Sequence, residues 1–79
     1  MQLKVGEIVE GTVKSLTKFG AFVALDANTT GLVHISELSD RYVKHPLDVV
    51  SVGDTVKVKI LSVDYDKQKV ALTMKGVRN

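Results

Sequence analysis

The sequence predicts an all-β domain, a five-stranded antiparallel barrel of Greek-key type with a short helical connection between the third and fourth strands. Apolar and polar residues alternate along five short segments, and turn-rich stretches separate most of these segments. One connection of about twenty residues breaks an otherwise simple meander. The chain of 79 residues is long enough for one small core. We therefore expect a single domain over residues 1–79, without room for an enzyme cleft.

The first three strands are predicted over residues 8–16, 21–25 and 31–35. In each, every second residue is small or apolar, as in a strand with one buried face. The positions assigned to the core are Val9, Gly11, Val13, Ala21, Val23, Leu25, Val33 and Ile35. The stretch DANTT between the second and third strands favours a hairpin.

The last two strands are predicted over residues 55–63 and 70–74, joined by the turn DYDKQK. Their expected core residues are Val56, Val58, Ile60, Val70, Leu72 and Met74, with Lys57 and Lys59 facing outward. In the long connection, Ser36 and Asp40 are candidate helix caps and Pro46 suits a first helical turn. This order of elements is that of the OB-fold, and closing the barrel removes exposed strand edges.

The composition limits the chemistry available to the chain. Apolar residues make up 44% and are mostly valine, leucine and isoleucine, which predicts an aliphatic core. The absence of cysteine removes disulfides and thiolate metal sites and fits a reducing compartment. Neither a secretory signal nor a membrane-spanning run is evident, so we expect a cytoplasmic protein without membrane contact. The net charge of +2 suits contact with a polyanion without deciding the partner.

The segment FGAF predicts an exposed aromatic surface. If Ala21 and Val23 face the core, Phe22 must face outward, because side chains alternate along a strand. Gly20 permits a bend that would bring the ring of Phe19 to the same outer face. The alternative is that Phe19 covers an end of the barrel and the long connection shields Phe22.

His34 is expected to join this surface from the third strand. The alternation leaves its side chain outside, and pairing across DANTT places it opposite Phe22 or opposite Ala24. Two phenyl rings and an imidazole would then share one patch. Exposed rings can stack on bases at about 1–3 kcal/mol per base, whatever the base sequence.

Four segments together resemble the S1 RNA-binding domain, an OB-fold family. They are VGEIVEGTVKSLTKFGAFVAL, GLVHISELS, VGDTVKVKILSVD and KVALTMK, and the resemblance covers residues 5–75. The connection DRYVKHPLDVVSVGD is most similar to the S1 module of Tex-type transcription accessory proteins, followed by single-domain S1 proteins of the general stress type. A free-standing module and a piece of a longer protein both stay open.

The resemblance implies a set of RNA-contacting residues. The positions that match those of the family are Phe19, Phe22, His34 and Asp64. Where the family often has an arginine, this chain has Gln68, between Lys67 and Lys69, so a planar guanidinium is missing. Lys14 and Lys18, near the start of the FGAF strand, could guide phosphates or could equally be solvated strand ends.

These observations predict a module that binds single-stranded RNA with little sequence preference, with single-stranded DNA as a further ligand. A protein-docking module for the ribosome or the transcription machinery is the alternative, as is an auxiliary domain of a larger RNA-processing protein. We expect a monomer, no cofactor and no metal, since His34 and His45 lack ligand spacing. We also expect no enzyme activity, because Ser36 has no nucleophile elbow and the chain has no phosphate-binding loop.

Overall fold

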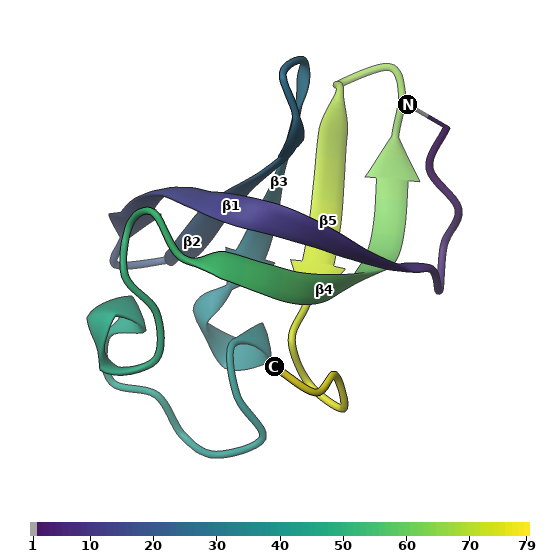
Figure 1. Ribbon diagram of the computed structural model, residues 1–79. Helices are drawn as coiled ribbons and strands as arrows, with labels where there is room; N and C mark the ends of the chain where they lie inside the picture. The colour runs from purple at the N-terminus through teal and green to yellow at the C-terminus, as the bar shows by residue number, and fades with distance from the viewer. Residues whose placement is uncertain (1) are drawn as a thin grey trace.

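Five strands and two single-turn 3-10 helices make up the computed structural model, which describes residues 2–79 (Figure 1). The elements are β1 (Ile8–Thr17), β2 (Gly20–Asp26), β3 (Thr29–His34), η1 (Ile35–Glu37), η2 (Pro46–Asp48), β4 (Thr55–Asp64) and β5 (Lys69–Thr73). The strands close into a barrel in the order β1-β2-β3-β5-β4. Four neighbouring pairs are antiparallel, and the pair that joins β3 to β5 is parallel. The predicted five-stranded barrel with a helical connection is confirmed.

The core is aliphatic, as the composition predicted. Val23, Val33, Val58 and Ile60 have no exposed surface, and the residues between them along each strand face outward. Some expected core residues lie at its margin instead, half-buried against the enclosed ones: Val9, Leu25, Ile35 and Met74. The closed barrel thus buries one face of every strand and leaves the other face toward solvent.

The register of the β2–β3 hairpin differs from the prediction. His34 lies opposite Gly20, and Phe22 lies opposite Leu32, so the expected pairing of His34 with Phe22 or Ala24 is wrong. The cause is a turn shorter than DANTT, because Asp26 already pairs with Thr29 and a bulge follows Ala24. His34 is therefore a diagonal neighbour of Phe22, and such neighbours are roughly 7–8 Å apart.

The cap of η1 is His34, where Ser36 and Asp40 were the expected caps. The Nδ1 atom of His34 accepts a hydrogen bond from the backbone N–H of Ser36 at 3.2 Å and lies 2.9 Å from its Oγ. In residues 2–79 no helix begins at Asp40. An imidazole nitrogen can do the work of a capping oxygen here, because it reaches the N–H two residues along the chain.

The second helix, η2, starts as predicted with Pro46 at its first position but is also capped by a histidine. The Nδ1 atom of His45 accepts from the N–H of Leu47 at 3.1 Å, and the carboxylate of Asp48 accepts from the N–H of His45 at 3.3 Å. This reciprocal pair anchors the middle of the long connection. Within residues 2–79, no helix is long and apolar enough to cross a membrane.

Candidate nucleic-acid interface

Gly20 brings the start of β2 against the end of β3. Its φ is +151°, and a Cβ there would lie 2.1 Å from the carbonyl oxygen of Val33, so no other residue fits without moving the backbone. The N–H of Ile35 donates to the carbonyl of Phe19 at 2.7 Å directly beside it. The FGAF segment and His34 are held together at one end of the barrel as a result.

An open hollow of about 500 Å³ lies on the outer surface of β2, β3, β4 and β5. We call it the aromatic hollow; among its lining residues are Phe22, Leu32, His34, Leu61, Asp64 and Gln68. Phe22 and Leu32 are half-buried, whereas His34, Asp64 and Gln68 are exposed. The hollow thus combines an apolar floor with polar groups at its margin, an arrangement that suits a flat heterocycle.

Asp64 and Gln68 reach the aromatic hollow from the two ends of the β4–β5 turn. One carboxylate oxygen of Asp64 accepts from the N–H of Lys67 at 3.1 Å, so this residue also closes the turn. Gln68 has a φ of +54°, the left-handed conformation that lets the chain reverse direction. The structure thus places the predicted residues Asp64 and Gln68 beside Phe22 and His34.

Phe19 is separate from the aromatic hollow and does not line it. The residue is 59% exposed, and the Nζ of Lys18 lies 5.2 Å from the centroid of its ring. This distance allows a cation–π contact. The single aromatic platform expected from the sequence is therefore divided between Phe22 in the hollow and Phe19 beside Lys18.

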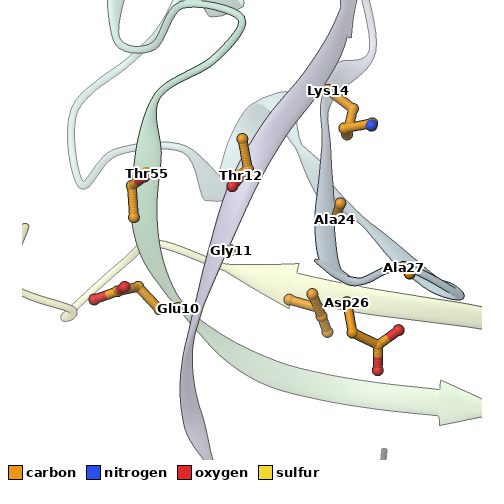
Figure 2. Close-up of a pocket in the computed structure, with 9 residues that line it drawn as sticks. Glu10, Gly11, Thr12, Lys14, Ala24, Asp26, Ala27 and Thr55 are labelled. Carbon is orange, nitrogen blue, oxygen red and sulfur yellow. The ribbon is translucent and has the colours of Figure 1, made fainter.

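Lys14 lies over a different surface, an open hollow of about 440 Å³ at β1 that Glu10, Thr12 and Asp26 also line (Figure 2). Lys14 is the extra residue in a bulge of β1. Lys67 does not line the aromatic hollow, whereas its neighbour Lys69 does.

Leu61 and Lys69 line the aromatic hollow although the sequence did not single them out as site residues. The side chain of Leu61 is 43% exposed, next to the fully buried Ile60. A large apolar residue at an outward position of a strand was the available signal for a binding surface.

The pKa of Asp26 is lowered from its usual value of 3.8, mainly by the hydrogen bond that its carboxylate accepts from the N–H of Asn28 at 2.8 Å. This carboxylate lies outside the aromatic hollow. The described part of the chain holds no group of three His, Cys, Asp or Glu side chains placed to bind a metal ion.

The sequence profile of the S1 RNA binding domain matches residues 2–75. The chain belongs to the S1 RNA-binding domain family. S1 domains are RNA-binding modules, and the resemblance noted in the sequence is thereby confirmed.

Two curated S1 relatives are much longer than this chain. It is 51% identical to the transcriptional accessory protein Tex of Neisseria gonorrhoeae over 92% of its own length and 10% of that protein. It is 53% identical to the small ribosomal subunit protein bS1 of Staphylococcus saprophyticus over 92% of its length and 18% of that protein. The chain thus spans less than a fifth of either relative.

The S1 fold of the chain also matches a solved structure. The solution structure of GSP13 from Bacillus subtilis has a TM-score of 0.86 and 49% identity, and the match covers 91% of this chain and 55% of that one.

Proposed function

We propose that this chain is a non-catalytic module that binds single-stranded RNA with little sequence preference through the aromatic hollow. The observation that carries the proposal is the convergence of Phe22, His34, Asp64 and Gln68 on one largely apolar hollow, in a chain of an RNA-binding family. A base stacked on Phe22 would contribute about 1–3 kcal/mol, and because every base has a π-face, sequence preference stays low.

His34 can donate a hydrogen bond to that base or its sugar. Its Nδ1 accepts from the backbone N–H of Ser36, so in the neutral ring the proton is on Nε2. The cap therefore fixes both the orientation of the ring and the nitrogen that donates. His34 acts as a polar partner beside the stacking ring of Phe22.

Phosphate contacts come from few lysines in this proposal. Lys69 lines the aromatic hollow, and Lys18 lies beside the exposed ring of Phe19, which offers a further stacking surface. With a net charge of only +2, the isolated module binds weakly. The much greater length of the relatives supports a role in which linkage to further RNA-binding parts raises the affinity.

The test is the substitution Phe22→Ala, followed by fluorescence anisotropy with a labelled RNA octanucleotide. We expect binding to weaken by about 1–3 kcal/mol, roughly 5- to 150-fold, because one base loses its stacking partner. Tyr42→Ala is the matched control, since Tyr42 is a 92% exposed aromatic residue on the long connection. Circular dichroism verifies that both variants are folded. Parent-like RNA binding by folded Phe22→Ala would refute the proposal.

Docking onto ribosomal or transcription proteins is the second candidate, and one observation favours it. The long connection exposes four large apolar side chains: Tyr42, Leu47, Val49 and Val52. A salt series separates the two candidates, because RNA affinity falls log-linearly with salt concentration while apolar docking hardly changes.

Single-stranded DNA should bind to the aromatic hollow as well as RNA, since stacking does not need the 2′-hydroxyl group. That the chain is monomeric and cytoplasmic stays a prediction from the sequence.

A further inference from the structure

A second hollow continues the aromatic hollow toward the end of the barrel where the β2–β3 and β4–β5 turns lie side by side (Figure 1). We call it the turn hollow; it has a volume of about 340 Å³ and is lined by Asn28 from one turn and Tyr65 from the other. The two hollows share Thr30, Asp64, Gln68 and Val70. The two hollows therefore adjoin, and together they extend from His34 to Tyr65; we call the pair the trough.

Tyr65 presents an aromatic ring at the far end of this trough. Its side chain is 70% exposed, and its hydroxyl donates a hydrogen bond to the carbonyl of Leu3 at 3.4 Å. The hydroxyl contact ties down one end of the side chain and leaves the ring open to solvent. A ring that is exposed yet held in place stacks on a base at a low cost in side-chain entropy.

The charges around Tyr65 select a base in preference to a phosphate. Asp64 is the one charged residue among those that line the turn hollow, and its carboxylate repels a phosphate. Asn28 and Gln68, which line the same hollow, have side-chain amides that can both donate to and accept from the edges of any base. The turn hollow thus has the same combination as the aromatic hollow, a ring with polar groups beside it.

We propose that Tyr65 is the second stacking position of the trough, separate from the exposed ring of Phe19, so that one RNA strand lies along the trough with one base on Phe22 and another base on Tyr65. The inference rests on the proposed function and extends the RNA footprint beyond the aromatic hollow. From Leu32, which lies opposite Phe22, to Thr30, where the turn hollow begins, β3 advances about 7 Å at roughly 3.3 Å per residue. A stacked strand advances about 3.4 Å per nucleotide, so a dinucleotide covers only one end of the trough.

The experiment measures the dependence of affinity on RNA length in three variants. For Tyr65→Ala, we expect the affinity for octaadenylate to fall roughly 5- to 150-fold, because one stacked base is lost. The affinity for the dinucleotide ApA, followed by NMR through the signals of Phe22 and His34, stays at the parent value. Tyr65→Phe keeps the ring and most of the affinity for octaadenylate. Tyr42→Ala, which removes a tyrosine far from the trough in sequence, binds both RNAs like the parent.

The outcomes separate this inference from the proposed function. If Tyr65→Ala binds octaadenylate like the parent while Phe22→Ala is weakened, the second position does not exist and the proposed function stands. If neither variant loses affinity, both fail. If Tyr65→Ala weakens ApA and octaadenylate equally, Tyr65 acts on the aromatic hollow itself and the inference of a longer footprint is overturned.

Discussion

The outward orientation of Phe22 could be predicted from the sequence, whereas the position of Phe19 could not. Alternation along the FGAF strand predicts that its ring faces outward, and the structure has it half-buried in the wall of the aromatic hollow, on the outer side of a strand whose Ala21 and Val23 are enclosed. Phe19 could not be placed in the same way, because it precedes the regular strand and the conformation of Gly20 decides where its ring lies. The structure separates Phe19 from the hollow and puts it beside Lys18.

Gln68→Arg should strengthen RNA binding. The residue lines both hollows of the trough, and an arginine there adds a guanidinium that can fork onto a phosphate. We expect a gain of about 0.5–1 kcal/mol, roughly two- to fivefold, as for an exposed ion pair. The slope of log affinity against log salt should steepen by about 0.7, the value for one more neutralised phosphate.

Gln68→Lys is the control for this substitution, because it adds the same charge without the planar fork. Its gain should be the smaller of the two. Anisotropy titrations at several salt concentrations measure both quantities. An arginine variant with the affinity and salt slope of the parent would show that position 68 does not contact RNA.

The β2–β3 hairpin shows, at the scale of the element, what alternation cannot settle. The strands, their inward faces and the existence of the hairpin all follow from the period-two pattern. The register does not, because shifting a strand by two residues keeps every side chain on the same face. Only the short turn closed by Asp26 and Asn28, with the bulge after Ala24, places His34 opposite Gly20. The histidine caps of the two 3-10 helices also escaped prediction, because histidine is not among the residues preferred at the start of a helix.

The carboxylate of Asp26 should make the stability of this hairpin depend on pH. Its pKa is lowered in the folded chain by the N–H of Asn28, so ionised Asp26 stabilises the fold above pH 3.8, and this contribution is lost as pH falls through the lower folded value. Asp26→Asn keeps an oxygen acceptor for the turn but cannot ionise. The stability advantage of the parent over Asp26→Asn should shrink as pH drops from about 5 to 2.

Thermal unfolding of both proteins over this pH range measures that difference. NMR titration of the Asp26 carboxyl group in the parent supplies the folded pKa independently. A stability difference that stays constant from pH 5 to pH 2, or a folded pKa at or above 3.8, would contradict the role assigned to the Asn28 hydrogen bond.

At the scale of the whole molecule, the site depends on how the barrel closes. β3 and β5 are joined by only two parallel residue pairs, Leu32 with Ala71 and Val33 with Leu72, and the aromatic hollow lies over this seam. The five-stranded barrel could be predicted because the aliphatic pattern and the long connection leave few other arrangements. Leu61 of the β4–β5 hairpin escaped prediction, because only the closed barrel brings it to the hollow that Phe22 also lines.

Closure of the barrel also decides which surfaces lie outside the proposed RNA path. The hollow at β1, which Glu10, Lys14 and Asp26 line (Figure 2), shares no lining residue with the aromatic hollow or the turn hollow. Residues 38–54 of the long connection, which include Tyr42, line neither of these two hollows. A strand of RNA bound in the trough should therefore change the surroundings of the trough residues and leave these two surfaces unaffected.

The most direct test of this account is an NMR titration of the isotope-labelled chain with single-stranded RNA octanucleotide, following every assigned signal at once. The account predicts that the largest shifts belong to Phe22, His34 and the β4–β5 turn, while Thr12 in the β1 hollow and Tyr42 in the long connection hardly move. Shifts concentrated on the long connection or the β1 hollow, with Phe22 and His34 unchanged, would contradict it.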